Sequence, residues 1–468
     1  MLADIELVTL HGCPVTRCRR LHLIAEPRNS LNGVQRKLIA VKIVQHNHVE
    51  GGRGNHRAHK FQRPAGYGMT DAEPGSNILT LNSGSSSLKF GLYRVGSSGT
   101  EMLLSGEAES IGDKKAKFYA QDSRANTLLS ETVSIPSQRE AIIRIGRLFA
   151  DSKMPAPTAI GHRVVHGGPK LRQHCLIDDS VLRQLEAATA FAPLHTPSAL
   201  SVIRFAQEHF PGLPQVACFD TTFHAELAAV ARVLPISKEL QLEGIQRYGF
   251  HGLSCESIVH QLANDLPNRL VIAHLGNGAS VTAVKGGKSI DTSMGLTPTG
   301  GVIMGTRSGD LDPGVLVYLM REKKFDAAML EELVDRRSGL LGISGVGSDM
   351  RRLQEAASSN ADARLAIQMF CYSVRKQVAA MIAALDGVDL IVFTGGIGEN
   401  DGEARAAICG GLAWIGVSLD NTRNRSANNP INDPASRCSV LVLASQEDEQ
   451  IDRHTWALFP RSSLCRCS

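Results

Sequence analysis

The chain of 468 residues is too long for one ordinary hydrophobic core, so its length predicts two domains. Hydrophobic residues make up 43% and charged residues 21%, as in globular proteins, and no apolar run is long enough to cross a membrane as a helix. The net charge of +4 arises in residues 1–68, which hold eleven Lys and Arg against four Asp and Glu. The remainder is mildly acidic, so the charge gives no argument that it binds nucleic acid.

Residues 1–75 form a basic leader without a clear alternation of strand and helix patterns. We expect this leader to be disordered, or to lie upstream of a true start near Met69, where "MTDAEPGSN" precedes the first strand pattern. The histidine-rich stretch "HNHVEGGRGNHRAHK" leaves a metal-binding or RNA-binding arm as an alternative, and a transit peptide is another.

The ten cysteines show none of the spacings of metal sites. Four lie near the ends of the chain, and the other six lie in apparent cores or turns. This pattern predicts free thiols in a reducing cytoplasm, and we expect a cytoplasmic protein with no membrane or nucleic-acid partner.

Short apolar stretches alternate with helical patterns from Asn77 onward, which predicts an α/β protein. Apolar residues recur three and four positions apart in the helical patterns. In chain order, the pattern predicts a strand at 78–82, a helix at 137–152, a strand at 159–165, a helix at 198–210, strands at 215–220 and 270–276, a helix at 361–385, a strand at 390–396, a helix at 403–416 and a strand at 439–445.

Two of the strand patterns run into similar loops. "ILTLNSGSSS" begins at Ile78 and "LVIAHLGNGAS" begins at Leu270, about 190 residues later. This faint repeat suggests two similar domains that face one another.

Three loops are rich in small residues. "NSGSSSLKF" follows the first strand with four serines and a lysine, which is more than a hairpin needs. "HLGNGAS" is typical of a β-hairpin turn, of a loop that aims backbone N–H groups at an anion, or of both. "IVFTGGIGEN" places glycines between a strand and a helix, where nucleotides bind in α/β sheets. The chain has neither GxxxxGK[ST] nor GxGxxG.

Charged residues stand at strand ends and among glycines. Arg163 in "GHRVVHGG" and Arg307 in "MGTRSGDLDPG" fit bidentate binding of a carboxylate or phosphate, although each could instead form a structural ion pair. Asp220 ends a strand and could face a ligand or cap a turn. His195 and His251 are each more typical of packed structural residues, but the whole set describes a pocket for a polyanion.

The chain has no GxSxG elbow and no CxxC pair, so nothing suggests a covalent hydrolase or a redox enzyme. Many N–H donors, two arginines and a few carboxylates suit phosphoryl transfer, which depends on positioning and on neutralisation of charge.

The motifs resemble those of acetate kinases, in that family's order. They include "NSGSSSLKF", "GHRVVHGG", "APLHTP", "FDTTFH", "RYGFHGLS", "HLGNGAS", "DTSMGLTPTGGVIMGTRSGDLDP", "GISGVGSDMR" and "FTGGIGEN". The resemblance extends from about Asn77 to Ile451, nearly the whole chain after the leader.

This resemblance implies the duplicated actin-like fold of acetate and sugar kinases, with an active-site cleft between two RNase H-like domains. Domain I would comprise residues 76–221 and 447–468, and domain II, which binds nucleotide, residues 222–446. The implied reaction is ATP + acetate = ADP + acetyl phosphate by direct in-line transfer in a homodimer, with Mg²⁺ or Mn²⁺ as cofactor and ATP as co-substrate.

The resemblance also implies roles for single residues. The catalytic residues would be Asp220, His251, Arg307 and Arg163. Acetate would contact Arg163, Val165, Leu194, Phe250 and Pro298. The metal would be held by Asn82 and Glu447. ATP would contact Lys89, Ser85, Ser87, His274, Leu275, Gly276, Asn277, Gly278, Asp349, Met350, Arg351, Gly396, Ile397, Gly398, Glu399 and Asn400.

The chain departs from the family pattern at Leu253 and Cys255 in "HGLSC", at Thr196 in "HTP" and at Thr299. These positions lie near the substrate side, so a propionate or butyrate kinase of the same fold stays open. Glu447, Asp448 and Glu449 are adjacent, which leaves the metal ligand open among them. A rival of another class is a non-catalytic actin-like protein that binds nucleotide.

Overall fold

A computed structural model describes residues 76–84, 86–96, 99–152, 154–193 and 195–458. These residues belong to one compact unit of the chain. The predictions for the leader, for Ser85 and for Leu194 concern residues outside the described ranges. Among the helices that the structure describes, none is long and apolar enough to cross a membrane.

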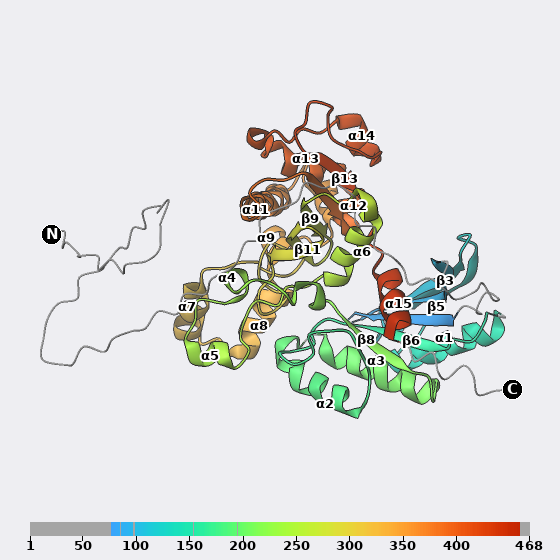
Figure 1. The fold of residues 1–468 in the computed structure, drawn as a ribbon. Helices are drawn as coiled ribbons and strands as arrows, with labels where there is room; N and C mark the ends of the chain where they lie inside the picture. Colours follow the sequence, from blue (N-terminus) through green and yellow to red (C-terminus); the bar gives the residue numbers. More distant parts are fainter. Residues whose placement is uncertain (1–75, 85, 97–98, 153, 194, 459–468) are drawn as a thin grey trace, which may run out of the picture. The chain divides into compact units, whose positions relative to one another are not determined.

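Two β-sheets organise the described residues (Figure 1). Sheet A has the order β5-β4-β3-β2-β1-β6-β8-β7 and comprises β1 (Ser76–Ser83), β2 (Leu88–Gly96), β3 (Gly99–Glu109), β4 (Ala116–Asp122), β5 (Thr127–Val133), β6 (Ala159–Val164), β7 (Cys175–Leu176) and β8 (Gln215–Phe219). Sheet B has the order β11-β10-β9-β12-β13 and comprises β9 (Arg269–Leu275), β10 (Ala279–Lys285), β11 (Lys288–Thr292), β12 (Leu390–Thr394) and β13 (Ser439–Val442).

The two sheets share the topology of five strands, to which sheet A adds β4, β5 and β7. In each, three consecutive antiparallel strands (β1 to β3, β9 to β11) are followed by two strands parallel to the first (β6 and β8, β12 and β13). The strands of the sequence repeat, β1 and β9, hold the same place in the two sheets. The α/β class and the predicted duplication are therefore confirmed.

Helices cover the faces of both sheets. Their bounds are α1 (Gln138–Asp151), α2 (Asp179–Ala187), α3 (Thr196–His209), α4 (Ala229–Arg232), α5 (Lys238–Leu242), α6 (Gly252–Leu262), α7 (Pro313–Lys323), α8 (Ala327–Arg336), α9 (Gly339–Ser344), α10 (Met350–Ala356), α11 (Ala361–Ala384), α12 (Gly395–Asn400), α13 (Gly402–Gly410), α14 (Asn421–Ser426) and α15 (Glu447–Leu458). The helices α1 and α3 pack on one face of sheet A, and α11 and α13 pack on one face of sheet B. Both faces are buried at the central strands β1, β8 and β12, which explains their nearly continuous apolar sequences. The outer strands β4 and β5 of sheet A alternate with exposed residues.

The sheets exchange one helix each. The helix α6 follows β8 of sheet A, but its Cys255, Ile258 and Leu262 pack on sheet B. The helix α15 follows β13 of sheet B, but it packs on β1, β2, β6 and β8 of sheet A, where its red ribbon lies beside β6 and β8 in Figure 1. Through this exchange, each sheet packs against a helix that follows a strand of the other sheet in the chain. The predicted domain bounds themselves stay a prediction.

The predicted helix at 403–416 is too long. The helix α13 ends at Gly410, and a separate short turn follows at Ala413–Ile415. A Cβ built on Gly411 would lie 2.1 Å from Nε of Arg375, so the Arg375 side chain occupies the space beside this glycine. The other predicted helices and the predicted strands are confirmed, with small shifts at their ends. The antiparallel strands β2 to β5 were not predicted.

Candidate active site

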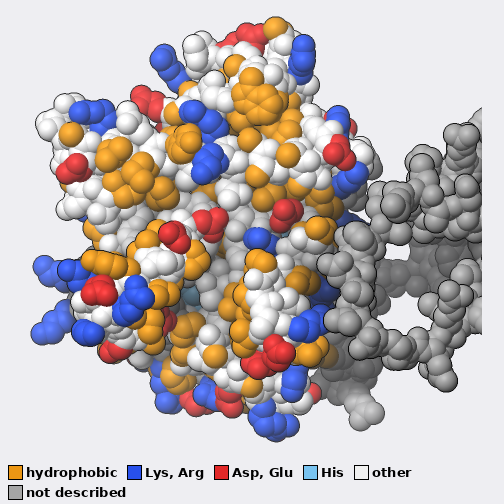
Figure 2. Space-filling model, turned by 90° about the vertical axis from the view of Figure 1, so that its left-hand side faces the viewer, with side chains coloured by type: hydrophobic (Ala, Val, Ile, Leu, Met, Phe, Trp, Pro, Cys, Tyr) orange, Lys and Arg blue, Asp and Glu red, His pale blue; other side chains and the backbone are white. Residues whose placement is uncertain are grey.

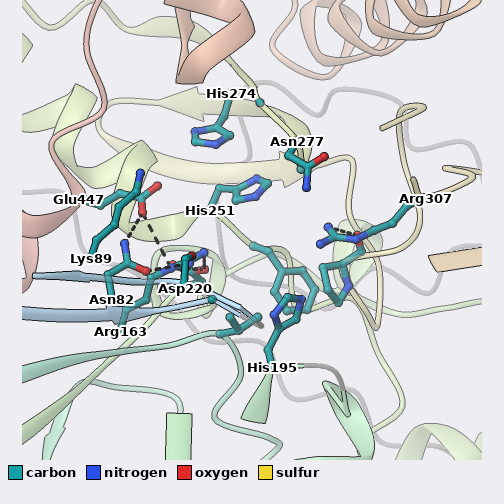
Figure 3. Close-up of a pocket in the computed structure, with 17 residues that line it drawn as sticks. Asn82, Lys89, Arg163, His195, Asp220, His251, His274, Asn277, Arg307 and Glu447 are labelled. Carbon is teal, nitrogen blue, oxygen red and sulfur yellow. Dashed lines mark hydrogen bonds and ion pairs between the residues drawn. The ribbon is translucent and has the colours of Figure 1, made fainter. Parts of the chain in front are cut away.

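A cavity of about 310 Å³ lies where the ends of β1, β6 and β8 meet the β9–β10 hairpin (Figure 3). It brings together most of the predicted catalytic, substrate and metal residues. Its walls contain Asn82, Ser87, Lys89, Arg163, Val165, Asp220, Phe250, His251, His274, Gly276, Asn277, Gly278, Pro298, Arg307 and Glu447. Gly84, from the predicted loop "NSGSSSLKF", and His195, from the residues predicted to form a polyanion pocket, also line it.

Strand register aligns three polar side chains on sheet A. Asn82 of β1 pairs with Lys89 of β2 on one side and with Arg163 of β6 on the other. Residues that pair across neighbouring strands project from the same face of a sheet, so the three side chains form a row. The row places positive charge on both sides of an amide oxygen.

Arg163 is held by an acidic partner at the end of β8. Its Nη2 lies 2.5 Å and its Nε 3.0 Å from Oδ2 of Asp220, and its Nη1 donates to Oδ1 of Asn82 at 3.1 Å. The ion-pair alternative is therefore correct for Arg163. Within the described residues, one N–H on each terminal nitrogen has no protein acceptor, so the guanidinium can still bind an oxyanion.

Burial raises the pKa of Asp220, to about 6, while the Arg163 guanidinium opposes this rise. Asp220 is therefore mainly ionised at neutral pH. Burial alone would lower the pKa of Arg163, but Asp220 and Glu447 hold it above its ordinary value. The pair stays charged and lies with Asn82, Lys89 and Glu447 on one side of the cavity in Figure 3.

Arg307 lies across the cavity and differs from Arg163 in its partners. Its Nη1 donates to the backbone oxygen of Pro298 at 3.2 Å and lies 3.6 Å from Sδ of Met304. No ion pair within 4.0 Å joins it to any carboxylate of the described chain. Burial lowers its pKa, and nearby Asp335 partly offsets this effect. A guanidinium that is desolvated without an anionic partner is suited to an anionic ligand.

Two histidines stack between these groups. His251 and His274 have ring centroids 4.2 Å apart with planes 22° from parallel. His251 occupies the left-handed region (φ 58°) at the start of α6, and Nδ1 of its ring lies 3.0 Å from Oγ of Ser280. Burial, then His274 and the two arginines, lower the pKa of His251 well below its usual value. Both rings are neutral at pH 7, because burial also lowers the pKa of His274.

Glycine at position 252 brings α6 against the carboxyl end of β8. The Gly252 N–H donates to the backbone oxygen of Asp220 at 2.8 Å. A Cβ at Gly252 would lie 2.2 Å from that oxygen. The close approach places His251, which lines the cavity, next to the end of β8 that carries Asp220.

The stretch "HLGNG" is both a hairpin turn and part of the cavity wall. Leu275 pairs with Ala279, and the Gly276 N–H donates to the Gly278 oxygen at 3.0 Å. A Cβ at Gly278 would lie 3.2 Å from both Nη1 of Arg307 and Nε2 of His251. The two glycines of the turn thus bring backbone without a Cβ close to Arg307 and His251, which confirms the hairpin. The role of this turn in binding an anion stays a prediction.

Some residues predicted to bind ATP do not line the cavity, namely Leu275, Asp349–Arg351 and Gly396–Asn400. Gly396 lies close to the turn, because a Cβ at Gly276 would stand 3.8 Å from its N atom. Leu275 and Met350 pack in the core of sheet B, and Asp349 caps α10. Oε1 of Glu399 accepts from the backbone N–H groups of Gly395 and Ser445. The roles of Leu275, Asp349–Arg351 and Gly396–Asn400 in binding ATP stay predictions.

Three potential metal ligands also meet at the contact of α6 and α15. Atoms of His174, Glu256 and His454 lie within 4.8 Å of one another. The Phe219 N–H donates to Nδ1 of His174 at 3.0 Å, so the neutral ring carries its proton on Nε2, the nitrogen that faces Glu256. A metal-bound histidine needs the opposite arrangement. Glu256, 2.7 Å from Nε2 of His454, therefore ties α6 to α15 by hydrogen bonding.

The two sheets have the arrangement of the duplicated actin-like fold, and the cavity gathers charged residues beside the β9–β10 hairpin. The sequence model of the acetokinase family matches residues 77–453. Acetate kinase of Nitrobacter hamburgensis is 42% identical over 390 residues, which cover 82% of this chain and 96% of that protein.

Two solved structures resemble the described fold. A propionate kinase from Francisella tularensis is 38% identical with a TM-score of 0.77, and acetate kinase of Porphyromonas gingivalis is 34% identical with a TM-score of 0.73. Each comparison covers 82% of this chain and 100% of the solved chain. The chain belongs to the acetokinase family, and it is an enzyme that phosphorylates a carboxylate. This membership excludes the non-catalytic rival.

Proposed function

We propose that the cavity transfers the γ-phosphoryl group of ATP directly and in line to acetate, giving ADP and acetyl phosphate. The observation that carries the proposal is the convergence of Arg163 and Arg307 on one cavity whose wall includes the glycine-rich turn Gly276–Gly278. Backbone N–H groups at such a turn suit phosphate oxygens, and guanidinium groups suit carboxylates and phosphates.

The acceptor needs little activation. A carboxylate is ionised at pH 7 and is an adequate nucleophile, so the difficulty is to bring two anions together. Arg307 supplies a positive charge that no described protein carboxylate neutralises within 4.0 Å. Arg163, oriented by Asp220, holds the acetate carboxylate through its remaining N–H groups. Together they offset the repulsion and the charge that spreads over the transferred group.

The neutral histidines act through hydrogen bonds. His251 and His274 have lowered pKa values because they are buried and stand near other cationic groups. An uncharged imidazole still donates one N–H to a phosphate oxygen. The positive charge at the reacting group therefore comes from the arginines and Lys89 rather than from imidazolium.

The chain's own oxygen atoms fit a divalent cation at one end of the cavity. Oε2 of Glu447 accepts from Asn82 Nδ2 at 3.3 Å. Burial raises the pKa of Glu447, but nearby positive charge, that of Arg163 above all, outweighs burial and leaves the pKa below its ordinary value. Next to it, the buried Oδ1 of Asp448 has no hydrogen-bond partner among the described residues. Mg²⁺ and Mn²⁺ prefer such oxygen ligands, and a bound ion would neutralise phosphate charge. Glu447, and neither Asp448 nor Glu449, lines the cavity.

The acyl group fits a small apolar surface. Val165, Phe250 and Pro298 line the cavity, and the side chain of His195 joins them. Burial, then Arg307 and Arg163, lower the pKa of His195 to about 4, so it adds no charge. Of the departures from the family pattern, Leu253, Cys255 and Thr196 are buried and do not line the cavity. The similarity to a propionate kinase keeps propionate as a second acyl group.

The test is product formation by the full chain. With ATP, Mg²⁺ and acetate, the protein should form acetyl phosphate, measured as acetyl hydroxamate after addition of hydroxylamine. Rates with acetate, propionate and butyrate, compared as kcat/KM, give the acyl preference. ATP binding without acyl phosphate from any of the three acids would contradict the proposal.

We further propose a homodimer. The helices α7 and α8 contain no buried residue, and α4 and α5 contain none either. The four helices lie on one side of the molecule in Figure 1, and Figure 2, which faces that side, shows hydrophobic side chains exposed over it. They include Val230, Val233, Ile236, Leu240, Leu242, Val315, Val317, Tyr318, Met320 and Met329. Apolar groups exposed in such number indicate a protein interface.

The cysteines support a reducing compartment. The six described cysteines are unpaired, and five of them are buried. Thiols of this kind persist in the cytoplasm, which we propose as the location of the enzyme.

A further inference from the structure

The carboxylate of Asp335 stands near Arg307 but does not pair with it. Hydrogen bonds hold the segments of the two residues side by side. The Ser308 N–H donates to the Val334 oxygen at 2.9 Å. The Thr306 hydroxyl donates to the backbone oxygen of Asp335 at 2.8 Å. Burial lowers the pKa of Arg307 and the charge of Asp335 partly offsets this effect, yet no ion pair within 4.0 Å joins the two side chains.

Two adjacent residues bind the two charged groups separately. The backbone oxygen of Pro298 accepts from Nη1 of Arg307 at 3.2 Å. The hydroxyl of the next residue, Thr299, donates to Oδ1 of Asp335 at 2.5 Å, a short hydrogen bond to a charged group. Arg307 lines the cavity and points into it in Figure 3, whereas neither Thr299 nor Asp335 lines the cavity.

This separation bears on the charge that Arg307 offers to a ligand. Near a protein surface, two opposite charges attract about four times as strongly as they do in water at the same distance. A carboxylate in contact with the guanidinium would compensate its charge and occupy its N–H groups, as Asp220 does for Arg163. Arg307 is therefore the arginine of the cavity whose charge depends on keeping a nearby carboxylate away.

We propose that Thr299 is a positioning residue that holds the Asp335 carboxylate away from Arg307, and so leaves the guanidinium free for the phosphoryl group in transfer. The inference rests on the proposed function, since it takes Arg307 as the group that stabilises the transferred phosphoryl group. Thr299 touches neither substrate nor cavity, and it acts through Arg307.

Kinetics of the full chain with ATP, Mg²⁺ and acetate test this role. Thr299→Val removes the hydroxyl at nearly constant shape, so Asp335 loses its partner and turns to Arg307. We expect kcat to fall about tenfold, with KM for ATP and acetate changed less than about threefold, because Arg307 acts on the transition state rather than on the bound substrates. Thr299→Ser keeps a hydroxyl and should retain kcat within about twofold of the wild type.

The decisive variant is Thr299→Val/Asp335→Asn. It removes the carboxylate that competes for Arg307, so kcat should recover to within about threefold of the wild type. A threonine that only supported the loop would show no such recovery. Thr299→Ala, which lacks the hydroxyl and is smaller, should give the same loss and the same recovery, so the test does not depend on how one variant packs.

The matched control is Thr306→Val. It removes a hydroxyl that also binds Asp335, but at the backbone oxygen rather than the carboxylate. Its activity should therefore be the same with and without Asp335→Asn. Wild-type kcat in Thr299→Val, or a loss that Asp335→Asn does not relieve, would overturn the proposed role of Thr299.

The same assays separate this inference from the proposed function. A wild-type protein that forms no acyl phosphate, or an Arg307→Ala variant with near-normal turnover, would refute the proposed function or the role of Arg307 in it. An active wild-type protein, an impaired Arg307→Ala variant and an unimpaired Thr299→Val variant would together refute only the role of Thr299.

Discussion

The two arginines of the cavity have the same chemistry but different surroundings. Arg163 has a buried carboxylate, Asp220, in direct contact, whereas the partners of Arg307 among the described residues are a backbone oxygen and a thioether. A buried ion pair is costly to break, because removal of one partner leaves the other charge without compensation. The two residues should therefore differ in their effect on stability, although both act on the same reaction.

Arg307→Ala should lower kcat by about 10²–10³-fold, since charge stabilisation at a transferring group commonly contributes that much. It should lower the free energy of unfolding by no more than about 1 kcal/mol, because no buried carboxylate loses its partner. Hydroxamate assays and urea unfolding measure the two effects. Arg163→Ala is the contrast: it should also lose activity but cost about 3 kcal/mol of stability, partly restored in Arg163→Ala/Asp220→Asn. Near-normal turnover of Arg307→Ala would contradict its role.

At the scale of elements, the exchanged helices α6 and α15 hold the site together. The first residue of α15 is Glu447, and the residue before α6 is His251, so each helix starts at the cavity. The close packing of α15 on sheet A requires a glycine in β6. A Cβ on Gly161 of β6 would lie 2.3 Å from Oγ1 of Thr455 and 2.5 Å from Cγ2 of Ile451, both on α15. The distance between α15 and sheet A is therefore set by a glycine.

Gly161→Ala should destabilise the protein by about 1–3 kcal/mol, because the added methyl group overpacks the contact between α15 and β6. The displacement of α15 should also raise the KM for ATP. Gly410→Ala is the matched control, since no described atom beyond its chain neighbours and its own helix backbone lies within 4 Å of a Cβ there, and Gly410 is exposed at the end of α13. Urea unfolding of both variants decides the matter, and equal stabilities would refute the packing argument.

The same helix carries a carboxyl group whose protonation affects stability. Asp452 is fully buried, accepts from Thr100 at 3.3 Å and has no described partner for Oδ2. Burial raises its pKa from 3.8 to about 8. The folded state therefore keeps this proton between pH 4 and 8 while the unfolded state loses it, so the contribution of Asp452 to stability falls as pH rises through this window.

Asp452→Asn should remove this pH dependence, since the amide keeps an acceptor for Thr100 and does not ionise. At pH 8 the variant should be more stable than the wild type by about 1 kcal/mol or more, and at pH 4 the two should be similar. Urea unfolding at intervals from pH 4 to 8 provides the comparison. Parallel curves for the two proteins would show that Asp452 does not titrate in this way.

At the scale of the whole molecule, two sheets of one topology form a cleft, and the remaining helices present an apolar face outward. The helices α7 and α8 have no residue in the described core, so packing within the chain does not explain their apolar residues. A second copy of the chain would bury these apolar residues. It would leave the cavity accessible, because no residue of α7 or α8 lines the cavity.

Val317→Asp/Met320→Asp should weaken self-association by at least about tenfold, because two charges would be buried against an apolar surface. Sedimentation velocity over a range of concentrations measures the effect. Leu365→Asp/Met369→Asp, on the exposed face of α11, is the control with equal added charge and should leave association unchanged. A wild-type protein that is monomeric at every concentration would exclude the homodimer.

The sequence by itself determined the α/β class, the order of the main strands and helices, the internal duplication and the family, because these depend on local periodicity and on motifs such as "HLGNGAS" and "GHRVVHGG". It also predicted that Arg163, Asp220, His251 and Arg307 belong to one pocket, since charged residues at strand ends and among glycines are informative without coordinates. The end of α13 at Gly410 was missed, because the apolar pattern continues beyond it although the pair Gly410–Gly411 has low helix propensity.

Only the tertiary structure decided how these residues work. Contacts between distant segments paired Arg163 with Asp220, left Arg307 without a carboxylate in the described chain, and placed His195 and Gly84 in the cavity wall. Burial, which a linear pattern does not reveal, made His251 and His274 neutral. Thr299 and Asp335 lie 36 residues apart in the chain and meet because the segments of Arg307 and Asp335 are joined by backbone hydrogen bonds, so no local pattern predicts their contact.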